Sequence, residues 1–528
     1  MTTPTIDALI RAHAAATPAR PMVIDPSARI TYGELDTSTR AFAATLVARG
    51  IGKGTRVGLI MPNCARWVQI SMSLARIGAV LVPLSTLLTG RELLAQLRAA
   101  DVTVLISVEE FRGHRYLEDL SGELGLESLP TGSDPLFIPR LPTLRSVWRA
   151  DEIVAEAATA ELEATVDGLM TAVRPADPMV IIFTSGSSGP PKGVLHSHGG
   201  ALKAVESGLA ARCIDADTRL YLPMPFFWVG GFGAGILSAL IPGATLVTEQ
   251  VPDPPTTLRL LERERVTLFR GWPDQAEALA RVRDSVGADL SALRPGSLEA
   301  LLPPTMRSEN GSRANLFGMT ESFGPYCGYP ADTDMPRSAW GSCGLPFLGV
   351  EVRIVDREHG RPVPPETVGE IQLRGPRMML GICGRTRESV FTPDGFYPTG
   401  DLGRLDADGF LFHHGRADDM VKVSGATVYP SEVRAALHTI DGVRAAFVTD
   451  IDGPAGARVA AAVVGEPGLT IEELRAAAKR ALSSFKIPTV WLLLSSDETI
   501  PRGPTGKVDV RALRELLLRA DSVTNQNR

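Results

Sequence analysis

The sequence has few cysteines, and their spacing does not suggest a metal site. The chain holds Cys64, Cys213, Cys327, Cys343 and Cys383. They form no CxxC pair and no other metal-ligand spacing. Sparse, unpaired cysteines are typical of a reducing compartment. We therefore expect a cytoplasmic protein.

Long apolar runs and an excess of positive charge are also absent. The most apolar stretch, residues 230–249, is interrupted by glycines and a proline, and a membrane span needs about 20 apolar residues. Residues 1–21 have no charged-then-apolar signal layout and predict one short amphipathic helix. The net charge of −6 gives no basic footprint for nucleic acid. We expect neither a membrane span nor a nucleic-acid partner.

The composition that remains is that of a soluble globular protein. The chain has 528 residues, of which 44% are hydrophobic and 22% charged. Strand-like runs alternate with helical patterns through roughly the first 300 residues, as in 56–62, 65–80 and 81–85. This alternation predicts βαβ units and mostly parallel sheets, which bind ligands at the carboxyl ends of their strands.

The pattern changes after about Gly341. Strand-like runs separated by Gly-Asp turns predict a compact β-rich subdomain that ends near Arg416. Strands and helices then alternate again in a smaller unit. We predict an α/β protein with a large N-terminal domain of parallel βαβ sheets plus this β-rich subdomain, residues 1–416. A small C-terminal α/β domain, residues 417–528, follows it.

One loop rich in glycine and hydroxyl groups follows directly on an apolar run. The stretch FTSGSSGPPKGVLHSH occupies residues 183–198. Backbone N–H groups and hydroxyls in such a loop, together with the charge of Lys192, suit phosphate binding. The P-loop motif is not met, because Lys192 follows Pro191 and precedes Gly193. The alternative is a surface turn with an incidental lysine.

This loop resembles the phosphate-loop signature of the adenylate-forming, acyl-activating enzymes, of the acyl-CoA synthetase and aryl-CoA ligase type. Four further stretches resemble the family's other signatures in the expected order: NLFGMTES (315–322), YPTGDLG (397–403), GRADDMVKVSGATVYPSEVR (415–434) and PRGPTGKVDV (501–510). The resemblance spans almost the whole chain. It implies that a carboxylic acid reacts with ATP to give an acyl-adenylate, and that the acyl group then passes to coenzyme A.

The resemblance assigns ATP contacts to two stretches. The β and γ phosphates would be held by Thr184, Ser185, Gly186, Ser187, Ser188, Gly189 and Lys192. The nucleoside would meet Asn315, Phe317, Gly318 and Met319. The Thr320 hydroxyl would contact the α-phosphate, and Glu321 would hold Mg²⁺, which keeps several waters. A Thr-Glu pair that begins a helix is the alternative.

Further roles fall in the last third of the chain. Asp401, expected on a turn, would accept the ribose hydroxyls, and Arg416 would reach the ribose or a phosphate. An ordinary turn residue and a surface ion pair are the alternatives for these two. Lys507 would bridge the carboxylate and the α-phosphate during adenylation. A solvated lysine is its alternative.

The resemblance also implies that the C-terminal domain is mobile and rotates between the two half-reactions. Asp418 falls at the hinge position of the family. Lys422 would approach the adenylate in the second orientation. The tunnel for the thiol would be lined by Val423, Ser424 and Gly425, where glycine lets a pantetheine arm pass close to the backbone.

The acid-binding segment departs from the family pattern. Where many members have P-x-F-H-x-x-G, residues 225–231 read PFFWVGG, so that Trp228 replaces the histidine. We assign the acid pocket to Phe226, Phe227, Trp228, Gly230 and Gly231. Such a pocket favours an apolar or aromatic acid, and core packing is the alternative for the aromatic residues. We assign no role to His196 or His198.

The acceptor of the acyl group is not fixed by these motifs, because the first half-reaction is common to the whole family. Coenzyme A is the main prediction, and a carrier-protein thiol or an amine is the alternative. A different class of function is a binding protein that keeps the fold without catalysis. The presence of Glu321, Asp401, Arg416 and Lys507 favours an enzyme.

Overall fold

The computed structural model describes residues 4–132, 135–155, 157–184, 192–417, 421–423, 426–452, 457–482, 486–503 and 508–526. The chain divides into two compact units, and each is described by itself. The first comprises residues 1–186, 190–351 and 374–395, and the second comprises 187–189, 352–373 and 396–528. The β-rich segment thus groups with the C-terminal part of the chain. The boundary between 416 and 417 stays a prediction.

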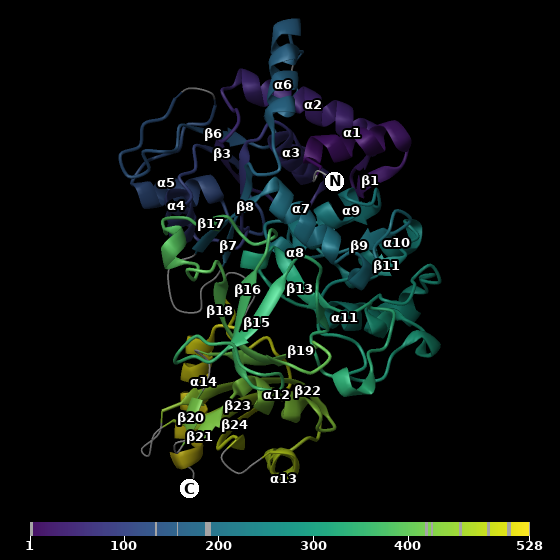
Figure 1. Ribbon diagram of the computed structural model, residues 1–528, viewed down its shortest axis with the longest axis vertical. Coiled ribbons are helices and arrows are strands. Elements are labelled where there is room, and N and C mark those ends of the chain that lie inside the picture. Colours follow the sequence, from purple (N-terminus) through teal and green to yellow (C-terminus); the bar gives the residue numbers. More distant parts are fainter. Residues whose placement is uncertain are drawn as a thin grey trace. The chain divides into compact units, whose positions relative to one another are not determined.

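A seven-stranded sheet in the first unit carries the phosphate-loop segment. Its order is β17-β8-β7-β4-β3-β5-β6. The parallel strands are β3 (Arg56–Ile60), β4 (Val80–Leu84), β5 (Val104–Ser107), β6 (Ser146–Arg149) and β7 (Pro178–Thr184). The helices α3 (Ala65–Arg76), α4 (Gly90–Ala99) and α5 (Tyr116–Leu124) connect them (Figure 1). The predicted βαβ pattern is confirmed.

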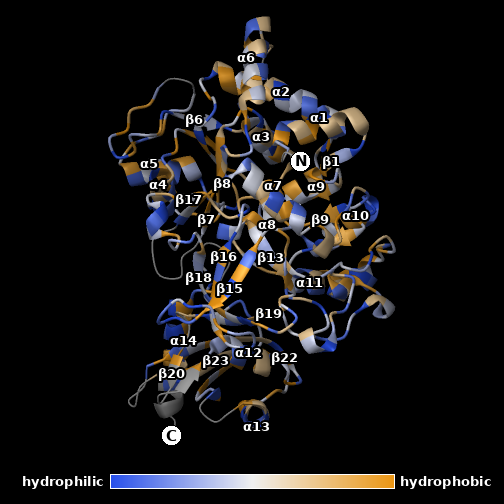
Figure 2. Cartoon of the chain, viewed as in Figure 1, coloured by the Kyte–Doolittle hydropathy of each residue, from blue (hydrophilic) through white to orange (hydrophobic). Residues whose placement is uncertain are grey.

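A five-stranded sheet in the same unit has the order β11-β9-β10-β1-β2. Its strands are β1 (Pro21–Ile24), β2 (Arg29–Thr31), β9 (Arg219–Tyr221), β10 (Thr245–Val247) and β11 (Leu268–Phe269). All except β2 pair in parallel. The helices α6 (Ala160–Ala172), α7 (His198–Ser207), α10 (Pro254–Arg263) and α11 (Pro273–Val286) belong to this unit. Figure 2 shows both apolar and polar residues on α10, as expected for a helix with one buried face.

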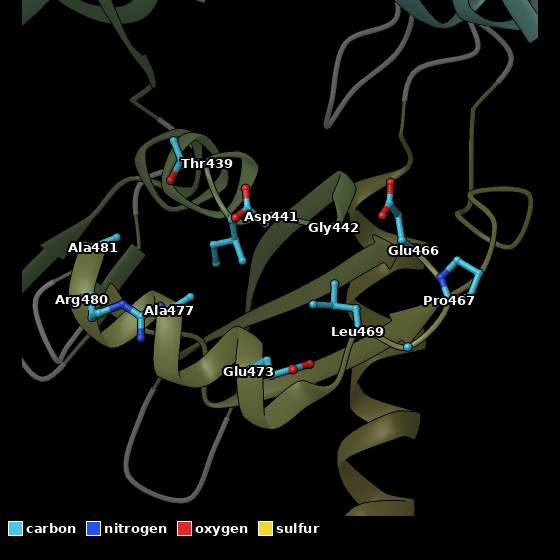
Figure 3. Close-up of a pocket in the computed structure, with 12 residues that line it drawn as sticks. Thr439, Asp441, Gly442, Glu466, Pro467, Leu469, Glu473, Ala477, Arg480 and Ala481 are labelled. Carbon is cyan, nitrogen blue, oxygen red and sulfur yellow. The ribbon is translucent and has the colours of Figure 1, made fainter.

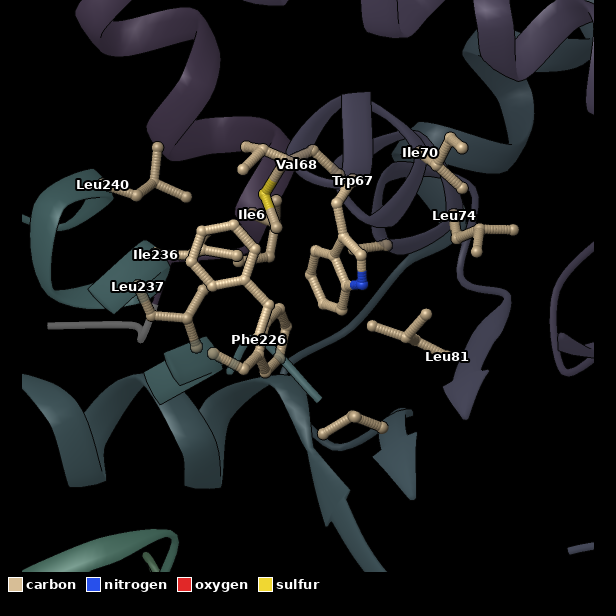
Figure 4. Close-up of a cluster of buried hydrophobic side chains, with 14 of the residues drawn as sticks. Ile6, Trp67, Val68, Ile70, Leu74, Leu81, Phe226, Ile236, Leu237 and Leu240 are labelled. Atoms are coloured by element: carbon tan, nitrogen blue, oxygen red, sulfur yellow. The ribbon is translucent and has the colours of Figure 1, made fainter. Parts of the chain in front are cut away.

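In the core of the first unit, several helices pack around a buried tryptophan, Trp67. The ring of Trp67 on α3 lies 5.3 Å from that of Phe226 (Figure 4). It lies 5.8 Å from the ring of Phe232. Phe232 begins a π-helical turn, η2 (Phe232–Leu237), between the short helices α8 (Val229–Gly231) and α9 (Ser238–Leu240). The helices α1 (Ile6–Ala16) and α2 (Tyr32–Ala48) pack on the same core. The N-terminal helix predicted from the sequence is therefore present.

The second unit combines an antiparallel sheet with a smaller α/β layer. The sheet contains β15 (Glu351–Val355), β16 (Gly369–Arg374), β18 (Tyr397–Leu405) and β19 (Leu411–Arg416). Further along lie a hairpin, β20 (Val421–Val423) with β21 (Ala426–Val428), and a sheet of β22 (Val443–Ile451), β23 (Arg458–Gly465) and β24 (Val490–Leu494). The helices are α12 (Pro430–His438), α13 (Ile471–Ala481) and α14 (Val510–Gln526). In the described part of the chain, no helix has the length and apolarity that a membrane span requires.

Candidate active site

The described strands on either side of the phosphate-loop segment form an antiparallel pair. The strands β7 and β8 (Lys192–Ser197) are antiparallel, and Thr184 lies directly opposite Lys192. The chain therefore returns along the sheet, whereas the strand of a P-loop is followed directly by a helix. Thr184 and Lys192 are both half-buried. The predicted contacts Ser185, Gly186, Ser187, Ser188 and Gly189 lie outside the described residues.

The GMTES stretch forms a tight turn between two antiparallel strands. The strand β12 (Phe317–Met319) leads into a 3₁₀ turn, η5 (Thr320–Ser322), and β13 (Gly324–Gly328) follows. A Cβ on Gly318 would lie 2.2 Å from the carbonyl oxygen of Gly324, so only glycine fits there. Thr320 is half-buried and Glu321 is buried. Thr320 and Glu321 therefore begin a helical turn, as the alternative reading of this pair expected. The turn lies next to the close approach of the Gly318 and Gly324 backbones.

The predicted nucleoside contacts precede this turn. Asn315 is exposed, and its backbone N–H donates to the carbonyl oxygen of Ser342 at 3.2 Å. The half-buried ring of Phe317 packs edge-on against Tyr326, with 5.5 Å between centroids. Gly318 is exposed and Met319 is half-buried. Phe317 thus keeps part of its ring accessible for a flat ligand.

Two carbonyls of the GMTES turn are held by residues that the sequence did not assign. The Nε2 atom of His196, on β8, lies 2.8 Å from the carbonyl oxygen of Thr320. The amide of Met379 donates to the carbonyl of Glu321 at 2.9 Å. The guanidinium of Arg377 donates to the carbonyl of Pro325 and to Ser207 Oγ. The turn is therefore fixed from two sides, by β8 and by the segment that leads into β17 (Gly381–Ile382).

The acid-binding segment divides into a core residue and a more exposed aromatic group. Phe226 is fully buried against Trp67, so its ring packs in the core (Figure 4). Trp228 is half-buried and meets Phe227 edge-on at 5.4 Å. Its other neighbour is Trp272, at 5.9 Å, which is 39% exposed and directly precedes α11. Trp272 was not predicted, although its position just past the parallel strand β11 is a signal for a ligand-facing residue.

The backbone of this segment is clamped and tightly bent. The side chain of Asn63 donates to the carbonyl of Met224 at 2.9 Å and accepts from the amide of Phe226 at 2.8 Å. A Cβ on Gly231 would lie 2.0 Å from the carbonyl oxygen of Pro225, and one on Gly230 would lie 2.8 Å from Met224 Sδ. The bend therefore requires glycine at 231, where the obstacle is backbone, whereas at Gly230 the obstacle is the end of a flexible side chain. Asn63 was missed because it lies 161 residues from its partner Met224.

In the second unit, Asp401 lies within a strand. The sequence placed it on a turn, which is wrong: it belongs to β18 and faces Arg416 across the pair with β19. The PTGD stretch has turn-like composition because Gly400 takes a φ of +73° inside the strand. The amide of Asp401 donates to Thr399 Oγ1 at 3.0 Å. The carboxylate is buried, and Arg416 Nη1 lies 3.5 Å from its Oδ1 atom.

The remaining predicted residues of the second unit are described only in part. Lys422 and Val423 lie on β20, opposite Thr427 and Ala426 of β21, and their side chains are not described. Asp418, Ser424, Gly425 and Lys507 lie outside the described residues. Arg502 and Val508 form an antiparallel bridge on either side of the segment that contains Lys507.

A pocket of about 640 Å³ lies in the second unit. It is lined by the ends of α12 and α13 and by the loop after β23, including Asp441, Glu466, Leu469 and Arg480 (Figure 3). None of the predicted site residues that the structure describes lines it. Within the described ranges, no group of three or more His, Cys, Asp or Glu side chains could hold a metal ion.

Comparison with known proteins settles the family. The family described as "AMP-binding enzyme" matches residues 10–383. The chain belongs to the AMP-binding enzyme family. The resemblance drawn from the five signatures is therefore confirmed.

Relatives of this family match over nearly their whole length. One, from Rhodococcus jostii (strain RHA1), is 32% identical over 93% of this chain and 95% of its own, and is named "3-[(3aS,4S,7aS)-7a-methyl-1,5-dioxo-octahydro-1H-inden-4-yl]propanoyl:CoA ligase". A protein of the same name from Mycobacterium tuberculosis (strain ATCC 25618 / H37Rv) is 34% identical over 92% of this chain and 94% of its own. The crystal structure of the anthranilate CoA ligase AuaEII in complex with anthranoyl-AMP covers 98% of both chains at 22% identity, with a TM-score of 0.78. This structure confirms the predicted fold class.

Proposed function

We propose that the chain is an AMP-forming acid–CoA ligase. It activates a carboxylic acid with ATP and then transfers the acyl group to coenzyme A. The observation that carries the proposal is the GMTES turn, fixed to the phosphate hairpin by the contact of His196 with Thr320. Relatives named as CoA ligases favour coenzyme A over an amine or a carrier-protein thiol as the acceptor.

In the first half-reaction, a carboxylate oxygen attacks the α-phosphorus of ATP, and the bond to pyrophosphate breaks. Both reactants are anions, so the site must supply donors and cations where charge develops. Lys192 and the hairpin would hold the β and γ phosphates, and Thr320 would donate its hydroxyl to the α-phosphate. Lys507 would bridge the carboxylate and the α-phosphate as a compact point charge.

Mg²⁺ is proposed at Glu321. This carboxylate is buried, and no cluster of three metal-ligating side chains exists among the described residues. Glu321 would supply the single carboxylate that Mg²⁺ often takes from a protein when it binds beside phosphates and keeps several waters. The ion would neutralise charge on the departing pyrophosphate. Asp401 would accept the ribose hydroxyls, with Arg416 beside it.

In the second half-reaction, the thiol sulfur attacks the acyl carbon, and the bond to AMP breaks. We assign this step to a second orientation of residues 417–528, reached by rotation at Asp418. Lys422 would then approach the adenylate, and Val423, Ser424 and Gly425 would line the thiol's path. The cytoplasm is the proposed location.

The substrate is proposed to be an apolar or aromatic acid. Trp228 and Trp272 present aromatic surface beside a segment that Asn63 holds in place, and the buried Phe227 packs behind Trp228. Such surface binds a ring or an alkyl tail through burial.

Replacement of Lys507 by alanine tests the proposal. Loss of one electrostatic contact to a transition state typically costs on the order of 10²–10³ in rate, so adenylation should fall by about that factor. Thioester formation from a supplied acyl-adenylate should persist. Lys479→Ala, on an exposed position of α13, is the control and should leave both steps unchanged. Equal loss of both half-reactions in Lys507→Ala would contradict the two-orientation scheme.

A further inference from the structure

Two nucleotide motifs of the first unit are joined by one side chain. His196 lies on β8, four positions after Lys192, and is fully buried. Its Nε2 atom reaches the carbonyl of Thr320, 124 residues away, at 2.8 Å. Its ring also packs edge-to-face against Phe323, with 4.9 Å between the centroids. Phe323 ends the turn and has a φ of 54°.

The chemistry of this contact is fixed by burial. Desolvation lowers the pKa of His196 to about 4, so the imidazole is neutral near pH 7. A carbonyl only accepts hydrogen bonds, so the proton of the neutral ring lies on Nε2. The strand that carries His196 pairs with β7 on one side and with β17 on the other. The donor therefore lies on a strand that β7 pairs along its length and that β17 pairs at Val194 and Leu195.

The turn itself does not need His196 in order to form. The carbonyl of Thr320 also accepts from the amide of Phe323 at 2.9 Å, and this bond closes the turn internally. A carbonyl oxygen has two lone pairs, and both are then used. Loss of the imidazole would leave the internal bond intact and remove the tie to β8.

We propose that His196 is a positioning residue for adenylation. It holds the turn of Thr320–Ser322 at a fixed place relative to the phosphate hairpin, so that both motifs meet the same ATP molecule. His196 acts through the Thr320 carbonyl and does not itself touch the substrate. The inference rests on the proposed function, in which Thr320 and Glu321 contact ATP.

A neighbouring histidine provides a matched control. His198 is also fully buried, and desolvation lowers its pKa to about 4 as well. Within the described residues, neither of its ring nitrogens has a hydrogen-bond partner. His196→Leu and His198→Leu therefore remove the same group from two buried positions, and only the first breaks a contact with the ATP site.

The test compares His196→Leu, His196→Gln and His198→Leu in acid-dependent ATP–pyrophosphate exchange, with thermal unfolding of each variant. In His196→Leu we expect kcat/KM for ATP to fall about tenfold, the equivalent of one hydrogen bond of about 1.4 kcal/mol, while KM for the acid stays fixed. His196→Gln, which keeps an N–H donor, should recover most of this loss. His198→Leu should lower only the unfolding temperature.

Calorimetric titration with ATP and Mg²⁺ separates this inference from the proposed function. His196→Leu should bind ATP about tenfold more weakly than the unmodified chain. If the unmodified chain binds ATP but shows no exchange with any acid, the proposed function is contradicted. The ATP affinities of the unmodified chain and His196→Leu would still test the role of His196. Equal losses in the two leucine variants, or a glutamine variant as weak as leucine, would overturn the role of His196.

Discussion

Gly318 and Gly231 have no room for a side chain. A Cβ on Gly318 would meet the Gly324 carbonyl at 2.2 Å, and one on Gly231 would meet the Pro225 carbonyl at 2.0 Å. Each obstacle is backbone, which cannot move aside as a flexible side chain can. The closeness of β12 and β13 thus explains the glycine of the GMTES stretch.

Gly318→Ala should lower both stability and ATP use. Overpacking typically costs about 1–3 kcal/mol of stability. The added methyl group would push β12 away from β13 and so displace Thr320, which directly follows β12. We expect a lower unfolding temperature and a lower kcat/KM for ATP. Gly381→Ala is the control, because a Cβ there meets nothing within 4 Å. If the two variants behave alike, close packing at Gly318 does not shape the site.

Trp228 and Phe226 are near neighbours with different expected roles. Trp228 is half-buried between two aromatic rings, whereas Phe226 is fully buried in the core. Trp228→Ala should open space for a longer or bulkier acid, because each methylene newly buried contributes about 0.8 kcal/mol. The ratio of kcat/KM for long over short acids should rise, and KM for ATP should stay nearly fixed.

Phe226→Ala gives the contrast. It should destabilise the first unit by about 3–5 kcal/mol, as core truncations of phenylalanine do, without a change in the preferred acid. Chain-length series with both variants, together with thermal unfolding, check these expectations. A uniform drop for every acid in Trp228→Ala, with reduced thermal stability, would mean that Trp228 is a core residue.

At the scale of elements, the residue two positions before α3 holds the segment between β9 and η2. Asn63 makes one hydrogen bond as donor and one as acceptor to backbone groups of Met224 and Phe226. Asn63→Ala leaves buried backbone groups unpaired, at a cost of about 1–3 kcal/mol each. We expect KM for the acid to rise about tenfold or more while KM for ATP changes little. Asn310→Ala, in an exposed turn, is the control, and equal effects on both substrates would argue against a local clamp.

The elements were predicted well where the signal is local. Periodicity gave the parallel strands, their helices and the amphipathic α1, because one buried face determines each of them. Asp401 was predicted on a turn because it follows Pro-Thr-Gly, a turn-like composition. In the structure Gly400 has a positive φ inside β18, and β18 pairs with β16 and β19. The sequence motifs identified Thr320 and Glu321. His196 and Asn63, in contrast, make their contacts with residues 124 and 161 positions away in the sequence. No local pattern records such contacts.

At the scale of the whole molecule, two buried histidines link the stability of the first unit to pH. Desolvation lowers the pKa of both His196 and His198 from 6.5 to about 4. Between these values the unfolded chain binds more protons than the folded chain, so stability rises with pH in this window and is lost as pH falls through it. Each histidine contributes a slope of up to about 1.4 kcal/mol per pH unit.

The unfolding temperature should therefore fall steeply between pH 6.5 and pH 4. His198→Leu should show a shallower fall than the unmodified chain. The buried Glu249, whose pKa is raised mainly by desolvation, is common to both proteins, so the comparison isolates the histidine. Thermal unfolding at half-unit steps checks this, and parallel curves for the two proteins would show that His198 is not buried in its neutral form.

The central claim is acid activation through an adenylate followed by transfer to coenzyme A. The most direct test incubates the chain with ATP, Mg²⁺ and a panel of apolar, aromatic and small polar acids, with and without coenzyme A, and identifies all products. The account predicts acid-dependent release of pyrophosphate and, once coenzyme A is present, equal amounts of AMP and acyl-CoA, with apolar or aromatic acids preferred. Formation of ADP and phosphate, or acyl transfer to an amine with none to coenzyme A, would contradict it.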